Sequence, residues 1–137
     1  MSLPDMLKPL DAALDSTDRS QAVAAAWEAF DVAAQVADTI AFEDGSDELQ
    51  ALIAAQASAE GRSLLPLPES GHPVDVPPLS PGAEGLTPLV SLLRRAQAAL
   101  ERMSGEPGVE EGGRAMMREA ADKAATAAGA LLAVRER

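Results

Sequence analysis

The chain has 137 residues, a length that suits one domain and is short for two. It contains no cysteine, which excludes disulfides, thiolate metal sites and cysteine nucleophiles, and its net charge of −11 disfavours binding to nucleic acids and anionic lipid surfaces. Hydrophobic residues make up 47% of the sequence, as in a folded protein, but alanine is the most frequent of them and only 2% of residues are aromatic.

The negative charge is concentrated at one end of the sequence. Residues 1–60 contain twelve acidic residues and two basic ones, whereas residues 87–137 contain seven acidic and eight basic residues. Because two acidic surfaces repel each other, we expect any contact between two copies of the chain to involve the near-neutral second half.

A short amphipathic helix is predicted first, because Leu7, Leu10 and Leu14 recur at helical spacing. Pro9 is expected in its first turn, since a proline further inside a helix removes a backbone hydrogen bond.

The second predicted helix runs from Ser16 to Phe42, with Asp15 or Ser16 as its N-cap and Gly45 in the turn that follows it. Its apolar residues step by four and three, which places them on one face. This stripe consists of Val23, Trp27, Phe30, Ala34, Ala37 and Ala41. We predict that the two aromatic side chains are buried and anchor the core.

A third helix is predicted from its N-cap Ser46 to Gly61. Its buried side is predicted to consist of Leu49, Leu52, Ile53 and Ala59. The preceding turn, residues 43–48, contains four carboxylates, so a calcium site is one hypothesis there. The spacing of an EF-hand is missing, however, and helix capping with dipole compensation accounts for these acids, so we predict no metal.

Residues 62–86 differ from the rest, with six prolines and three glycines, too many for a helix or a central strand. Seven leucine and valine side chains in the same block predict an ordered, extended crossover that lies on the helices. His72, the only histidine, and the PxxP sequence of residues 78–81 also fall here. We interpret both as structural, because His72 lacks catalytic partners nearby and the PxxP sequence lacks a flanking basic residue.

Thr87 as N-cap, followed by Pro88, predicts the start of a fourth helix. Its apolar stripe consists of Leu89, Leu92, Leu93, Ala96, Ala99, Leu100 and Met103. A fifth helix is predicted from about residue 109 or 113 to Val134. One face of it carries Met116, Ala120, Ala124, Ala127, Leu131 and Val134, flanked by Ala121, Ala125 and Ala128. The small flank would let two neighbouring helices approach closely.

The sequence contains no recognisable catalytic apparatus. The Glu-x-x-His motifs of a di-iron bundle are absent, and the only paired glycines, Gly112 and Gly113, follow acidic residues that disfavour a phosphate. We therefore predict a non-enzymatic protein without catalytic residues, cofactor or metal. No stretch approaches the ~20 apolar residues of a membrane span and no signal peptide is recognisable, so a cytoplasmic location is expected.

Basic side chains are concentrated between residues 94 and 118. They are Arg94, Arg95, Arg102, Arg114 and Arg118. We interpret them as facing the acidic first half of the chain or solvent, with an anionic ligand or acidic partner as the alternative.

Taken together, these patterns predict an all-α protein with a single domain, residues 1–137. It is expected to be a bundle of four main helices plus a short N-terminal helix, with the Pro-rich crossover between the third and fourth helices. Whether this bundle is purely up-and-down or includes a parallel pair is left open.

The leading functional hypothesis is protein–protein interaction together with self-association, as a homodimer. It rests on the thin alanine core, which favours burial of further surface in a contact. The alternative is a small apolar-ligand-binding protein with a pocket between helices near Trp27 and Phe30. The candidate ligand or interface residues are Trp27, Phe30, Leu89, Leu93, Leu100 and Met103.

Overall fold

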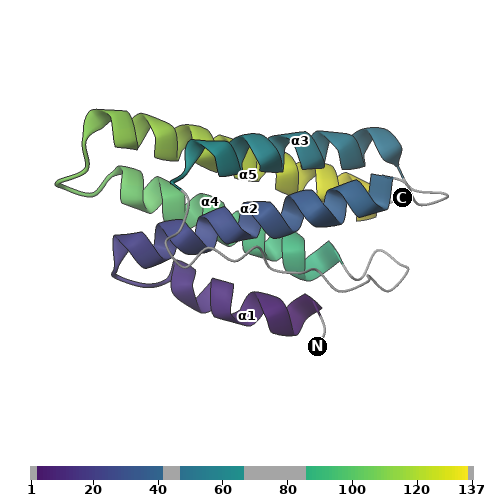
Figure 1. Cartoon of the computed structure of the whole chain (residues 1–137), viewed down its shortest axis with the longest axis horizontal. Helices are drawn as coiled ribbons and strands as arrows, with labels where there is room; N and C mark the ends of the chain where they lie inside the picture. The colour runs from purple at the N-terminus through teal and green to yellow at the C-terminus, as the bar shows by residue number, and fades with distance from the viewer. Residues whose placement is uncertain (1–2, 42–46, 67–85, 136–137) are drawn as a thin grey trace.

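The protein is built from five α-helices. The computed structural model describes residues 3–41, 47–66 and 86–135, and no β-strand occurs in these ranges. In chain order the helices are α1 (Leu3–Leu14), α2 (Arg19–Ala41), α3 (Glu48–Leu64), α4 (Thr87–Ser104) and α5 (Glu111–Arg135) (Figure 1). The predicted all-helical bundle, with four main helices and a short N-terminal one, is confirmed.

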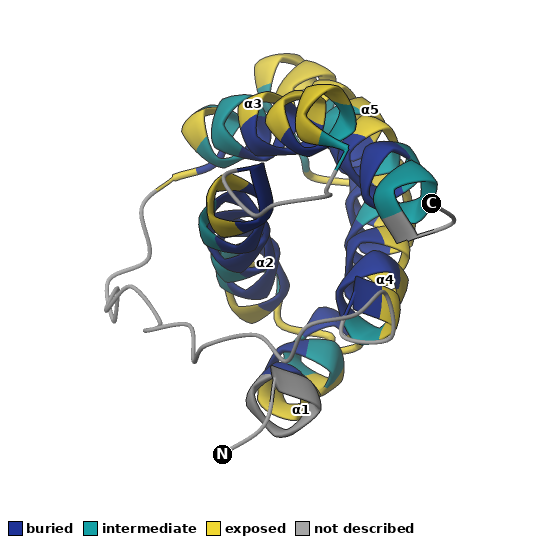
Figure 2. Ribbon diagram, turned by 90° about the vertical axis from the view of Figure 1, so that its right-hand side faces the viewer, coloured by how far each residue is buried: buried dark blue, intermediate teal, exposed yellow. Residues whose placement is uncertain are grey.

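Seen along their axes, the helices form a closed ring with their buried sides turned inwards (Figure 2). Around this ring α2 contacts α3, α3 contacts α5, and α5 contacts α4, while α1 closes the ring between α4 and α2. Contacts between α2 and α4 cross the interior. Fifteen of the 23 residues of α2 are buried, so this helix is the centre of the core.

The directions of the helices show that the bundle is not purely up-and-down but includes a parallel pair. The chain runs one way along α1, α3 and α4 and the opposite way along α2 and α5, so the neighbours α1 and α4 are parallel (Figure 1). Most of the predicted crossover, residues 67–85, lies outside the described residues, and its order stays a prediction.

The predicted apolar stripes of α2 and α4 are confirmed as the core. Trp27 is 8% exposed and Phe30 is fully buried, as are Leu89, Leu93 and Leu100 on α4. On α5 the alanine stripe is also buried, between α3 and α4, whereas Met116 at its beginning is 43% exposed.

Several predicted details of the helix ends are wrong, including the N-cap of α4, which is Leu86 and not Thr87. Pro9 lies in the middle of α1, which begins earlier than its leucines suggest, so one backbone hydrogen bond of that helix is missing. The residue before α2 is Asp18, whose carboxylate accepts a hydrogen bond from the Ser20 amide (3.0 Å). The cap of α3 is Asp47, which accepts from the Gln50 amide (3.2 Å).

The predicted buried side of α3 is also wrong. Leu49, Leu52 and Ile53 are 67%, 44% and 37% exposed. The buried side of the helix consists instead of Ala51, Ala54, Ala55, Ala57, Ser58 and Gly61. Because α3 lies between α2 and α5, both rich in alanine, small side chains let the three helix axes come close together.

The prediction that α3 ends at Gly61 is wrong. Gly61 lies inside the helix, next to the ring of Phe30. A Cβ atom at this position would stand 2.5 Å from two carbons of that ring. Phe30 is fully buried, so its ring is enclosed by the core. Glycine at residue 61 therefore sets the distance between α2 and α3.

Replacing Gly61 with alanine is expected to destabilise the protein by up to about 2 kcal/mol. The overlap with Phe30 costs about 1–3 kcal/mol, which outweighs the roughly 1 kcal/mol that alanine gains over glycine in a helix. The measurement is urea denaturation followed by circular dichroism. Gly129→Ala is the matched control, because Gly129 lies inside α5 with no atom within 4 Å of an added Cβ, and it should not lose stability. Equal stability changes in the two variants would contradict the close packing of α3 on α2.

Candidate functional site

The six candidate residues from the sequence all lie in the core of the single chain. Trp27, Phe30, Leu89, Leu93, Leu100 and Met103 are each at most 8% exposed. Their burial confirms the aromatic anchors of the core, but it leaves these side chains without surface for a partner in this structure. A site for recognition must therefore be sought elsewhere on the bundle.

Three of the four large apolar residues that are exposed in the described part of the chain lie on α3. Leu49, Leu52 and Ile53 are spaced i, i+3 and i+4, which places them side by side on one face of a helix. We call these three residues the α3 outer face. It lies on the side of α3 turned away from the ring, where the ribbon is exposed in Figure 2. Single exposed leucines are ordinary on protein surfaces, whereas a contiguous apolar stripe is characteristic of contact surfaces.

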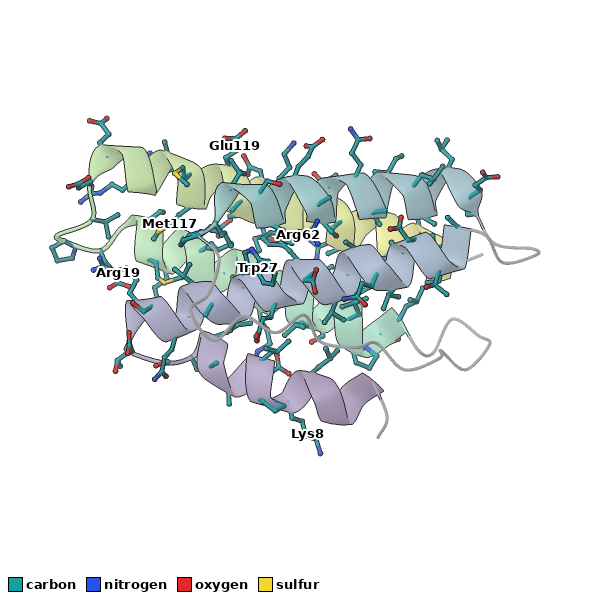
Figure 3. The ribbon with its side chains drawn as sticks, in the orientation of Figure 1. Lys8, Arg19, Trp27, Arg62, Met117 and Glu119 are labelled. Atoms are coloured by element: carbon teal, nitrogen blue, oxygen red, sulfur yellow. The ribbon has the colours of Figure 1, made fainter. Side chains whose placement is uncertain are left out.

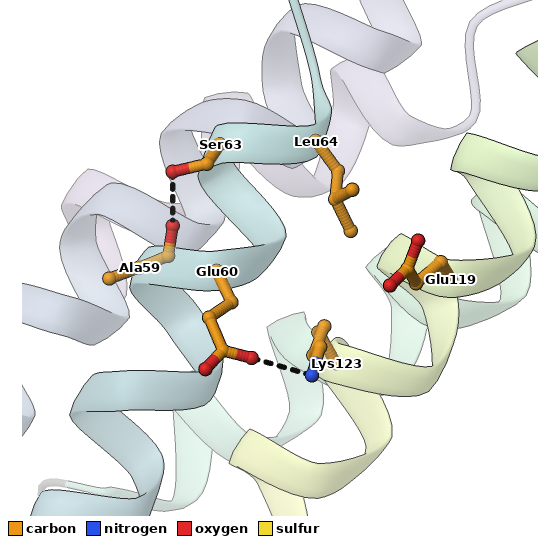
Figure 4. A pocket seen from close by; sticks show the side chains of 6 residues that line it. All are labelled: Ala59, Glu60, Ser63, Leu64, Glu119 and Lys123. Carbon is orange, nitrogen blue, oxygen red and sulfur yellow. Dashed lines mark hydrogen bonds and ion pairs between the residues drawn. The ribbon is translucent and has the colours of Figure 1, made fainter.

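The groove between α3 and α5 is a second candidate site. It is lined by Ala59, Glu60, Ser63, Leu64, Glu119 and Lys123 (Figure 4). Lys123 and Glu60 form an ion pair across it, with 2.5 Å between Nζ and Oε2. The hydrogen bond from Lys123 lowers the pKa of Glu60, and the same bond raises the pKa of Lys123. The principal charges of this groove are thus paired with each other, and the pair ties α3 to α5.

A second pocket lies at the start of α5 and is lined by Val109, Glu111, Arg114 and Arg118. The Arg114 guanidinium is engaged there, because it donates to the carbonyl oxygens of Val109 (3.1 Å) and Glu106 (3.3 Å). It therefore fixes the turn between α4 and α5. Neither this pocket nor the groove is lined by Trp27 or Phe30.

Two of the remaining arginines contact the acidic first half of the chain, as the sequence predicts for the basic group. Arg95 forms ion pairs with Asp11 (3.3 Å) and Asp15 (2.9 Å), and Arg102 donates to the Leu14 carbonyl (3.1 Å). Both residues join α4 to the acidic first helix. Arg94 and Arg118 are exposed.

A buried charge cluster connects α2 to the end of α3. Asp31 on α2 is 6% exposed and accepts hydrogen bonds from Arg62 (2.6 Å) and Gln35 (3.0 Å). Arg62 belongs to the last turn of α3 and lies near α2 (Figure 3). Partial burial, and then the nearby Asp31 carboxylate, raise the pKa of Glu28 above its ordinary value of 4.5. The cluster is a structural link, since its cation is already used by Asp31.

Replacing Glu28 with glutamine is expected to raise the melting temperature at pH 7. A carboxyl whose pKa is raised on folding favours the folded state below its unfolded pKa and loses that contribution as pH rises through its folded pKa. The gain from glutamine should therefore disappear at about pH 3.5, where both states bind the proton. Thermal melts at the two pH values measure this difference. Glu101→Gln, at an exposed position of α4, is the control, and an equal response of both variants would refute the prediction.

Several features singled out in the sequence fall outside the described residues, namely His72, the PxxP sequence and residues 43–46 of the acidic turn. In the part that is described, no group of three or more histidine and acidic side chains is placed to hold a metal ion. None of the helices that the structure describes has the length and hydrophobicity to cross a bilayer.

Comparison with known proteins gives no relative: no family model, no curated protein and no solved structure matches the chain. The α3 outer face had a signal in the sequence, because its three large residues form a helical stripe. That stripe was assigned to the wrong side of the helix.

Proposed function

We propose that the protein is a cytoplasmic, non-enzymatic protein that acts by binding a protein partner through the α3 outer face. The observation that carries this proposal is the exposure of Leu49, Leu52 and Ile53, between 37% and 67%, on one side of one helix. Each such side chain contributes roughly 1.5–3 kcal/mol when it is fully buried, so a partner that covers all three gains a large part of a binding energy.

The fold itself makes little use of these three side chains. The core contacts of α3 come from its small residues, and the α3 outer face is turned away from them. Large apolar residues on the surface lower solubility and add little stability to the folded chain. A role in recognition accounts for their position.

Self-association stays a prediction, but the residues of α4 that were its candidate interface do not support it. The candidate interface residues of α4, which are Leu89, Leu93, Leu100 and Met103, are all buried within one chain. Neither of the two pockets described above is lined by Trp27 or Phe30, so these pockets do not support the small-ligand alternative.

Selection from a library of displayed helical peptides tests the proposal. The wild-type protein is the target, and the triple variant Leu49→Ser/Leu52→Ser/Ile53→Ser is the counter-target. We expect peptides that bind the wild type and lose at least about tenfold in affinity, or 1.4 kcal/mol, on the triple variant. Met116→Ser is the matched control, because Met116 has nearly the same exposure as Leu52 but lies on another helix.

The triple variant should keep the circular dichroism spectrum of the wild type, since the α3 outer face takes no part in the core. If the selection returns only peptides that bind the triple variant equally well, the α3 outer face is not a binding surface.

A further inference from the structure

We infer that the element recognised by the α3 outer face is a basic amphipathic helix. This inference rests on the proposed function and adds the chemistry of the partner to it. It follows from the charges that surround the apolar stripe on each neighbouring element.

Along most of their length, α2 and α3 carry only negatively charged side chains. Between Arg19 and Arg62 the sequence has eight acidic residues and no lysine, arginine or histidine. Asp38 is exposed in the last turn of α2, and Glu48 is exposed at the first residue of α3, directly before Leu49. Asp47 caps the same helix end. The apolar stripe therefore has an acidic border at this end of the bundle.

The acids at the other end of α3 are neutralised within the chain. Glu60 pairs with Lys123 of α5, and Asp31 pairs with Arg62. Among the described residues Asp38 and Glu48 have no such ion-pair partner. On the described parts of α2 and α3, Asp38 and Glu48 are exposed acids without an ion pair, and both lie at the end of the bundle where α3 begins.

The flank provided by α5 is uncharged from Ala124 to Val134, and α5 ends in Arg135 near the beginning of α3. α5 runs antiparallel to α3, and its Lys123 lies opposite Glu60, so its second half lies beside the beginning of α3 (Figures 1 and 4). Between Lys123 and the last residue of α5, Arg135, the sequence has no charged residue. The surroundings of the α3 outer face are consequently acidic on α2 and α3 and uncharged along this part of α5.

This pattern favours one occupant over a second copy of the chain. Two copies in contact at their α3 outer faces would bring their Asp38 and Glu48 side chains together, and like charges at an interface oppose association. A partner helix with lysine or arginine beside its apolar stripe fits this surface in shape and in charge. Its ridge of apolar side chains packs on a stripe spaced i, i+3 and i+4, and its basic side chains face the acidic border.

The test uses a synthetic amphipathic peptide of about 18 residues, five helical turns, made of leucine and lysine and labelled with fluorescein. A second peptide has the same leucine positions with glutamate in place of lysine. Fluorescence anisotropy measures binding of each peptide to the wild type and to two charge variants, Asp38→Asn/Glu48→Gln and the control Glu101→Gln/Glu119→Gln, which alters exposed acids on α4 and α5.

We expect the leucine–lysine peptide to bind the wild type at least about tenfold more tightly than the leucine–glutamate peptide does. Asp38→Asn/Glu48→Gln should weaken this binding several-fold, more than the control pair does, and so should an increase in salt from about 50 to 500 mM. The triple serine variant should weaken it more than Met116→Ser does, which separates contact at the α3 outer face from general attraction to an acidic protein.

The outcomes separate this inference from the proposed function. If library peptides require the α3 outer face but are neutral or acidic, the proposed function stands and the basic partner is refuted. If the leucine–lysine peptide binds the triple serine variant as well as the wild type, its attraction is nonspecific and the inference fails. Sedimentation equilibrium that shows a dimer lost in the triple serine variant would identify a second copy as the occupant and overturn the inference.

Discussion

Replacing Trp27 with alanine is expected to lower the free energy of unfolding by about 3–5 kcal/mol, the usual cost of removing a large aromatic side chain from a core. Trp27 is 8% exposed and belongs to the core cluster on α2, the helix that contacts α1, α3 and α4. The neighbouring core residues are mostly alanines with short side chains, which cannot extend into the space that indole leaves. The loss is large against the 5–15 kcal/mol of total stability typical of a domain.

Urea denaturation followed by circular dichroism measures this loss, because the variant has no tryptophan left for fluorescence. Met116→Ala is the control, since Met116 is 43% exposed and its removal should change stability by less than about 0.5 kcal/mol. In the wild type, indole emission should be shifted to the blue of free indole in water. Emission like that of free indole, or a loss no greater than that of the control, would show that the core is not organised around Trp27.

Replacing Arg62 with methionine is expected to cost about 2–3 kcal/mol. The change leaves the Asp31 carboxylate, 6% exposed, with the single hydrogen bond from Gln35. Removing one partner of a fully buried ion pair costs about 3–5 kcal/mol, and the expected value is smaller here because Arg62 itself is partly exposed. Methionine keeps much of the aliphatic length of arginine, so the change tests mainly the charge and the hydrogen bond.

A double-mutant cycle isolates the pair. Asp31→Asn/Arg62→Met should be more stable than Arg62→Met alone, because the neutral amide no longer needs a cation. Arg94→Met, at an exposed position of α4, is the control and should be nearly neutral. If the single and double variants lose the same stability, the ion pair between α2 and α3 makes no contribution of its own.

Arg62 and Gly61 also explain how the fold positions the candidate binding surface. Both are in the last turns of α3, and both fix the inner side of this helix against α2, one by charge and the other by the absence of a side chain. With the inner side held, the opposite side of the same helix must face outwards. Variants at these two residues should therefore weaken partner binding only to the extent that they unfold the protein.

Residue patterns along the chain predict the class of fold and most of the core. The stripes of α2 and α4 contain large side chains such as Trp27, Phe30 and Leu100, and a large apolar stripe on an amphipathic helix has one stable place, the interior. The number of helices and their approximate limits followed from these stripes and from the proline and glycine residues between them. Local chemistry was sufficient for these features because each depends on residues within one helix.

The buried side of α3 and the relative directions of the helices depend on packing between helices, so local patterns do not predict them. α3 has two stripes with helical spacing, one of large residues around Leu52 and one of small residues around Ser58, and periodicity alone favours the large one. The choice depends on residues far away in sequence, since α2 and α5 present alanines and the ring of Phe30, against which only a small side packs closely. The parallel placement of α1 and α4 likewise depends on the packing of whole helices around α2, which no local pattern records.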